Sequence, residues 1–63
     1  MKTYHVQIIK HTRGEWEDSY ELEDTKTVDA YGPWDAIRRA NVPKGYDIGS
    51  TSVTFEAKAF RIQ

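Results

Sequence analysis

The chain has 63 residues, with nine Lys and Arg against ten Asp and Glu, and a formal net charge of −1 at pH 7. This length predicts a single domain, residues 1–63, near the lower size limit for a core without disulfides or a structural metal. The sequence contains no cysteine, which excludes disulfides and thiolate metal sites. The balanced charge argues against the bulk attraction to phosphate on which most nucleic-acid-binding modules rely.

The first residues contain no apolar run long enough for a signal peptide or a membrane span. We therefore expect a soluble, cytoplasmic protein without a membrane partner. The chain has two Trp, four Tyr and two Phe. Because each aromatic ring removes a large apolar surface from water, we expect these residues to supply much of the buried area. The predicted core is aromatic.

Two alternating stretches, residues 4–11 and 16–30, carry their apolar side chains at even positions, which is typical of half-buried strands. A two-residue loop between them would expose half of these side chains, whereas a three-residue loop at residues 12–14 keeps both even sets on one face. The expected opposite pairs are Val6 with Tyr20, Tyr4 with Leu22, His5 with Glu21, and His11 with Glu15.

A helix is predicted to begin at Pro33, because proline at the first helical position loses no needed hydrogen bond. Asp35 lies in the first turn and two arginines lie in the last, where their charges suit the helix dipole. We expect Pro43 to end the helix after about nine residues, because the residue before a proline avoids helical angles. The expected inward face consists of Pro33, Ala36, Ile37 and Ala40.

Residues 44–52 are predicted to form a glycine-containing loop, and residues 53–62 a third strand with a bulge near residues 57–60. The fold class is then α+β: a three-stranded antiparallel sheet with one short helix packed on one face, in the order strand, strand, helix, strand. The expected core consists of Tyr4, Val6, Ile8, Tyr20, Leu22, Val28, Ile37, Ala40 and Phe55.

The sequence offers no catalytic, cofactor-binding or metal-binding residues. Two histidines, His5 and His11, lie six positions apart on one strand, roughly 20 Å, which is too far for one metal ion. Ser19 and Ser50 have no positioned base. Three glutamates, Glu17, Glu21 and Glu23, are expected to share a flat outer face and to be solvated rather than tuned as an acid and base pair. We therefore expect a protein that is not an enzyme and needs no cofactor.

Two groups of charged residues are candidate binding surfaces. Seven acids fall between residues 15 and 29 against one Lys26, and they either protect an exposed strand edge or present charge to a basic protein. The residues expected to contact a partner there are Glu15, Glu17, Glu21 and Glu23. The alternative surface, on the outer side of the helix and just beyond it, consists of Trp34, Arg38, Arg39 and Lys44. Tryptophan and arginine are common at binding hot spots, although Trp34 can equally well cover the end of the core.

The segment of residues 30–48 resembles small phage-encoded host-takeover proteins, most of all the RNA polymerase inhibitors of short-tailed coliphages. The likeness covers about a third of the chain, and its most specific part is Val-Pro-Lys-Gly-Tyr-Asp-Ile at residues 42–48. The other matching residues are Ala30, Asp35, Ala36 and Ala40. The inhibitors carry an Arg-x-Arg pair directly after this stretch, where this chain has Gly-Ser-Thr-Ser at residues 49–52.

The resemblance implies a non-enzymatic phage accessory protein in the host cytoplasm. Its partner would be a host protein with a basic surface, such as RNA polymerase, bound through the acidic hairpin. Two alternatives remain open: a nucleic-acid-binding module using the helix residues, and a homodimer in which the sheet edge or a patch around Ile9 is covered by a second copy.

Overall fold

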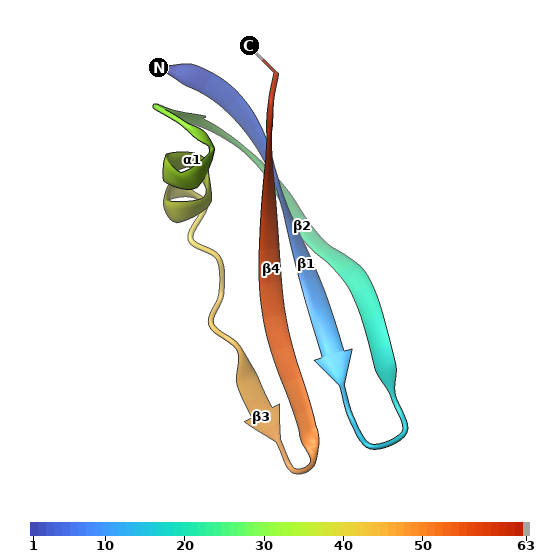
Figure 1. Cartoon of the computed structure of the whole chain (residues 1–63). Helices are drawn as coiled ribbons and strands as arrows, with labels where there is room; N and C mark the ends of the chain where they lie inside the picture. The colour runs from blue at the N-terminus through green and yellow to red at the C-terminus, as the bar shows by residue number, and fades with distance from the viewer. Residues whose placement is uncertain (63) are drawn as a thin grey trace.

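The computed structural model describes residues 1–62, which form one antiparallel sheet and one helix (Figure 1). The elements are β1 (Lys2–Arg13), β2 (Asp18–Ala30), α1 (Pro33–Arg39), β3 (Tyr46–Ile48) and β4 (Thr51–Arg61). The sheet has four strands in the order β2-β1-β4-β3. The α+β class, the antiparallel sheet and the single short helix are confirmed. The expected number of three strands is wrong, because β3 lies inside the segment predicted to be a loop.

The additional strand β3 depends on pairing with β4 rather than on a strong local pattern. Tyr46 pairs with Val53 and Ile48 with Thr51, across a turn that begins at Gly49 with a φ of 60°. A residue with a Cβ is strained at this φ, which explains the glycine. Gly45 also lies close to β4, because a Cβ there would be 2.7 Å from the carbonyl oxygen of Val53. The strand therefore forms only because β4 is present beside it.

The helix begins at Pro33 as predicted, but it ends at Arg39 and contains seven residues. Asn41 adopts a left-handed φ of 55°, a conformation common after the last helical turn. Asn41, rather than Pro43, therefore ends the helix. The two alanines of the inward face, Ala36 and Ala40, are buried, and Ile37 is half-buried. The prediction for Pro33 is wrong, because this residue is exposed.

The β1–β2 hairpin has a four-residue turn, residues 14–17, in which the Gly14 N–H donates to the Glu17 carbonyl at 2.6 Å. The register then shifts within the ladder, since Ile8 pairs with Asp24 and Ile9 with Leu22. Glu23 is left as the extra residue of a β-bulge. All four predicted cross-strand pairs are therefore wrong. The observed pairs are Tyr4 with Val28, His5 with Thr27, Val6 with Lys26, and His11 with Tyr20.

The bulge reverses the alternation of β2, and this corrects two expected core residues. From residue 24 to residue 30 the even positions of β2 share the face of Tyr4, Val6 and Ile8, which is the face that α1 covers. Before the bulge the even positions lie on the opposite face, which we call the open face. Tyr20 and Leu22 are there, 62% and 60% exposed.

Strand β4 has no bulge, contrary to the prediction for residues 57–60. It pairs with β1 without a shift from Arg61 opposite Tyr4 to Ser52 opposite Arg13. Phe60 therefore lies on the open face, opposite His5, and is 49% exposed.

The core is small and mostly aliphatic. Six buried residues form one cluster: Tyr4, Val6, Ile8, Ala30, Ala36 and Ala40. Val53, 4% exposed, is also buried but lies outside this cluster. Partly buried residues packed against it are Val28, Ile37, Val42, Phe55, Ala57 and Ala59. The alanines on the helix and the sheet let the two approach closely, so that little room remains for large rings. The expectation of an aromatic core is wrong: Trp16 is 92% exposed and Trp34 is 83% exposed.

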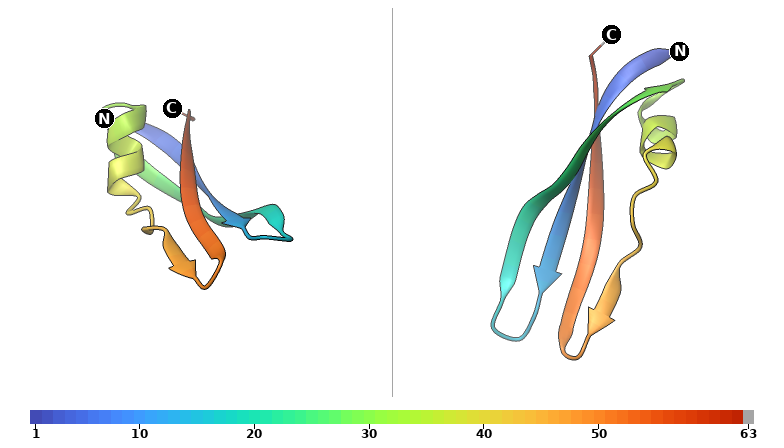
Figure 2. Two further views of the ribbon diagram at one scale, coloured as in Figure 1. Left: turned by 60° about the horizontal axis from the view of Figure 1, so that its bottom comes forward. Right: turned by 180° about the vertical axis from the view of Figure 1, so that it is seen from behind.

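The helix covers only the half of the sheet where β1 begins and β4 ends, whereas both hairpin turns lie at the other end (Figures 1 and 2). The molecule is 43 Å long, with a radius of gyration of 13.4 Å. A compact chain of this length has a radius of gyration of about 11 Å. Half of the sheet is therefore a single layer, with no second layer packed on it.

Candidate functional site

Residues 1–62 form no pocket, and they bring together no group of three or more side chains that could hold a metal ion. The helix of this part of the chain is too short and too polar to cross a membrane. Candidate functional sites are therefore surfaces on the sheet or the helix.

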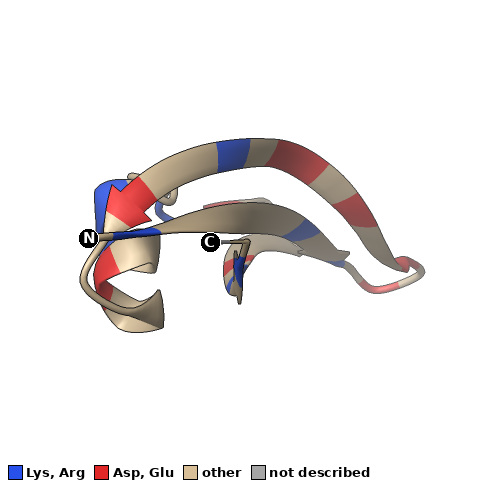
Figure 3. Cartoon of the chain, turned by 90° about the horizontal axis from the view of Figure 1, so that it is seen from above, with Lys and Arg blue, Asp and Glu red and all other residues tan. Residues whose placement is uncertain are grey.

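The first surface, the acidic edge, follows the β1–β2 turn and the edge strand β2 (Figure 3). It consists of Glu15, Glu17, Asp18, Glu21, Glu23, Asp24 and Asp29. The expectation that Glu17, Glu21 and Glu23 share the outer face is wrong. Glu17 lies in the turn, Glu21 lies on the helix side of the sheet opposite Lys10, and Glu23 is the bulged residue. The acids therefore share an edge rather than a face.

The carboxylates of the acidic edge differ in how far they are neutralised. Glu21 has the Lys10 ammonium 3.7 Å away. Three others, Glu15, Glu17 and Glu23, have no side-chain hydrogen bond or ion pair among the described residues. These three are exposed, and their charge is available to a partner.

Lys26, the lone cation among residues 15–29, does not neutralise the acidic edge. Its Nζ donates a 2.7 Å hydrogen bond to the carbonyl oxygen of Ala40, at the C-terminal end of α1. A cation at this end of a helix satisfies a free carbonyl and interacts favourably with the helix dipole. The side chain is therefore directed over the covered face, toward the helix, and leaves the strand edge negative.

Exposed apolar side chains accompany the acids. Trp16 lies in the hairpin turn, and Tyr20 and Leu22 lie on the open face, where Leu22 is opposite the half-buried Ile9. The Tyr20 ring stacks on His11, with ring centroids 4.2 Å apart and an angle of 8° between the planes. His11 Nε2 is also 2.5 Å from Asp18 Oδ1, so Asp18 replaces the expected partner Glu15.

Sequence reasoning missed Trp16, Tyr20 and Leu22 as surface residues because their even spacing suggested a buried face. A signal for their exposure was nevertheless present in the chain. Acids occupy both odd and even positions between residues 17 and 24, and charged side chains on both faces are typical of a strand that is exposed on both faces.

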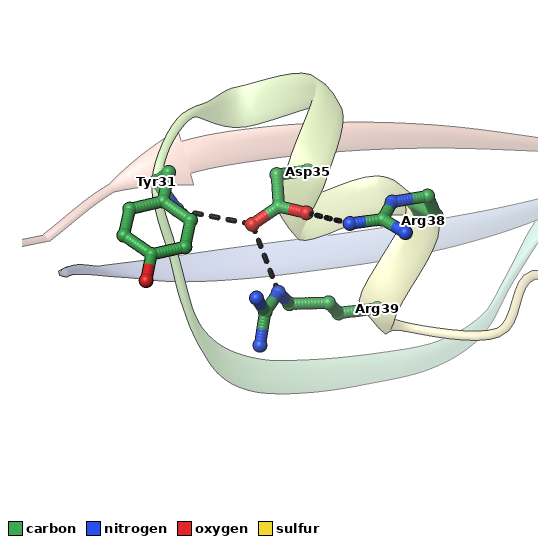
Figure 4. A network of polar contacts seen from close by, with 4 residues as sticks. All are labelled: Tyr31, Asp35, Arg38 and Arg39. Carbon is green, nitrogen blue, oxygen red and sulfur yellow. Dashed lines mark hydrogen bonds and ion pairs between the residues drawn. The ribbon is translucent and has the colours of Figure 1, made fainter.

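The second surface is on the helix, where Asp35 organises both arginines (Figure 4). Asp35 Oδ1 accepts a 2.5 Å hydrogen bond from Arg38 Nη2, and Oδ2 accepts one of 2.8 Å from Arg39 Nε. The backbone N–H of Tyr31 also donates to Oδ2, at 3.1 Å. The Arg38 hydrogen bond, followed by the Tyr31 N–H and Arg39, lowers the pKa of Asp35 from 3.8 to about 2. The carboxylate is thus ionised near neutral pH and partly neutralises both arginines.

The remaining members of the helix surface are exposed. Trp34 is 83% exposed, which excludes the alternative that it covers the end of the core. Arg38 lies one turn further along the helix, with 78% of its side chain exposed. Arg39 is 39% exposed, with its Cζ 5.7 Å from the centroid of the Tyr31 ring. Lys44 is exposed on the segment between α1 and β3.

Comparison of the chain with protein-family models, with curated proteins and with solved structures found no match. The choice between the acidic edge and the helix surface as a binding site therefore depends on the geometry and charge of each. The acidic edge offers three unpaired carboxylates beside exposed apolar side chains, whereas on the helix the two arginines are already bound to one carboxylate.

Proposed function

We propose that this protein is a non-enzymatic binding protein that attaches to a basic surface of another protein through its β1–β2 hairpin. The observation that carries the proposal is the unbalanced charge of the acidic edge. Glu15, Glu17 and Glu23 have no partner among the described residues, while Lys26 is bound to the carbonyl of Ala40. An uncompensated charge at the surface accelerates encounter with a complementary protein and orients the two molecules.

Bacterial RNA polymerase is the partner that we propose to test first, with the chain acting in the cytoplasm of a phage-infected bacterium. The resemblance of residues 30–48 to phage polymerase inhibitors supports this choice. Residues 49–52, which lack the Arg-x-Arg pair of those inhibitors, form the β3–β4 turn and the start of β4. In our proposal the hairpin at the other edge of the sheet supplies the main contact instead.

A nucleic-acid-binding function has less support. Arg38 and Arg39 are both bound to Asp35, and the neighbouring strand β2 carries carboxylates that repel phosphate. Two paired arginines and one lysine do not make a basic groove.

The experiment measures association of the intact chain with purified bacterial RNA polymerase at low and physiological salt. The double variant Glu17→Gln/Glu23→Gln removes two unpaired charges from the acidic edge. The control Asp47→Asn/Glu56→Gln removes two exposed charges from β3 and β4. We expect the first variant to associate several-fold more slowly at low salt, the control to resemble the parent, and the difference to shrink as salt screens the charges.

Equal slowing of both variants would indicate a general effect of net charge and would contradict a hairpin contact. If the parent does not bind polymerase, that target is wrong. A partner recovered from a bacterial lysate by mass spectrometry then replaces it in the same kinetic comparison, where unchanged rates for the hairpin variant would refute the proposed function itself.

A further inference from the structure

Strand β2 has a backbone edge with which no other strand of residues 1–62 pairs. It contains 13 residues and lies at the end of the sheet order, paired with β1 alone. In an edge strand every second residue directs its N–H and C=O groups away from the sheet, where they can pair with another chain. One backbone amide of β2, that of Thr25, donates a hydrogen bond to Asp24 Oδ1 at 2.8 Å. Within the described residues, no other backbone amide of β2 has a partner apart from those in the ladder with β1.

The open part of this edge has defined limits. At one end the bulge at Glu23 and the bond from Thr25 to Asp24 interrupt the regular ladder. At the other end β2 begins at Asp18, directly after the hairpin turn. Residues 18–22 between these limits pair with β1 without a shift and span about 17 Å, which is the length of an ordinary short strand.

We infer that residues 18–22 accept an added β-strand from the partner, and that this strand alternates apolar and basic residues. The inference rests on the proposed function and specifies how the partner is recognised. Backbone hydrogen bonds to an open edge supply affinity in this mode, and alternate side chains supply specificity. The added strand makes β2 an inner strand of a five-stranded sheet.

The side chains of β2 select this pattern. On the open face Tyr20 and Leu22 are 62% and 60% exposed, and apolar side chains of an added strand would lie beside them. On the helix side the residues are Ser19 and Glu21, and Glu21 has the Lys10 ammonium 3.7 Å away. The bulged Glu23, directly after the stretch, has no side-chain partner among the described residues. Basic side chains of the added strand would lie beside these carboxylates, where opposite charges across a strand pair are favourable.

A second copy of this chain does not fit the same edge. Antiparallel pairing of two β2 strands would bring the acids of both copies together without additional bases, because Lys10 already pairs with Glu21 and Lys26 with Ala40. Like charges that face each other across strands destabilise the pairing. A basic segment of another protein is therefore the favoured occupant.

The probe is a capped seven-residue peptide, Lys-Val-Lys-Val-Lys-Val-Lys, titrated into the isotope-labelled full chain. Nuclear magnetic resonance measures its affinity and the exchange rates of individual amides. We expect shift changes at residues 18–22 and slowed exchange at those of their amides that point away from β1, with little change at residues 51–61. A matched peptide with N-methyl groups on two consecutive central residues obstructs both of its edges, and we expect it to bind about tenfold more weakly because backbone hydrogen bonds are lost.

Two variants test the side-chain contacts. Leu22→Thr keeps a strand-forming residue but removes the apolar contact, so it should weaken binding of the peptide several-fold. Phe60→Thr alters another exposed apolar residue of the open face and should leave the affinity unchanged.

The outcomes separate this inference from the proposed function. Equal binding of the methylated and unmodified peptides, or slowed exchange outside residues 18–22, would overturn strand addition. The proposed function would survive that result if Glu17→Gln/Glu23→Gln still slowed association with the protein partner. A dimer of the chain itself with protected amides at residues 18–22 would also overturn the inference, because the edge would then be occupied by a second copy.

Discussion

Two adjacent isoleucines give a direct test of which face of β1 is buried. Ile8 is 1% exposed and lies on the face covered by α1, whereas Ile9 lies half-buried on the open face. Each change to alanine removes the same atoms from the same strand. The difference between the variants therefore measures the cost of losing core packing, with strand propensity held constant.

The expected loss for Ile8→Ala follows from its burial. Three buried carbons contribute about 0.8 kcal/mol each, and the remaining cavity raises the total to about 3 kcal/mol. A domain of 63 residues has a free energy of unfolding of about 3 to 9 kcal/mol. Ile8→Ala should thus remove a third or more of the stability and lower the Tm by about 10 to 20 °C. Ile9→Ala should cost about 1 kcal/mol or less, because the side chain is already partly hydrated.

Thermal and urea unfolding followed by circular dichroism measure both values. A loss for Ile9→Ala that equals the loss for Ile8→Ala would refute the assignment of the two faces. It would also indicate that the open face is covered in solution, for example by a second copy, and the effect would then depend on protein concentration.

Three further predictions concern single contacts. The pKa of Asp35 is lowered from 3.8 to about 2 in the folded protein. Its contribution to stability is therefore present above pH 4 and is lost as the pH falls from about 4 to 2. Asp35→Asn should remove this part of the acid dependence of Tm. Gly45→Ala should destabilise the fold by about 1 kcal/mol or more, since the new Cβ would lie 2.7 Å from the Val53 carbonyl. Gly32→Ser, which adds a side chain in open space at the N-cap of α1, where serine is at least as favourable as glycine, should not lower the urea midpoint. Lys26→Met keeps the aliphatic stem but removes the bond to the C-terminal carbonyl of α1, and should cost about 1 kcal/mol in urea unfolding.

Local signals in the sequence were sufficient for much of the fold. The even alternation of β1 identified Tyr4, Val6 and Ile8 as inward residues, and all three are buried. Proline at the first turn and the charges at both ends of the helix identified α1, because these residues act within one turn of where they stand. The edge strand was recognisable from its density of acids.

The bulge at Glu23 was not predictable from the pattern of apolar residues. Tyr20, Leu22 and Val28 all stand at even positions, which suggests that they share one face, although the bulge places the first two on the opposite face from the third. The second error came from the assumption that so short a chain must bury its rings. The helix covers half of the sheet, and Trp16 and Tyr20, which lie outside that half, are exposed.

The candidate site was predictable in composition but not in geometry. The sequence identified a surplus of carboxylates near the hairpin. It did not indicate which of them are unpaired, because Lys26 finds its partner at Ala40, fourteen positions away. That contact depends on how the helix lies on the sheet and leaves no local signal.

Because α1 covers only part of the sheet, the two ends of the molecule differ in local stability. Where α1 packs, opening a strand exposes buried apolar side chains, but near the two hairpin turns it exposes few, so local opening costs little there. Amide exchange should accordingly be fast around the turns and slow near Val6. A partner that docks on the hairpin must order this less stable end. The lost conformational entropy lowers the net free energy of binding. Complex formation should therefore slow exchange most in the part of the chain that opens most readily on its own.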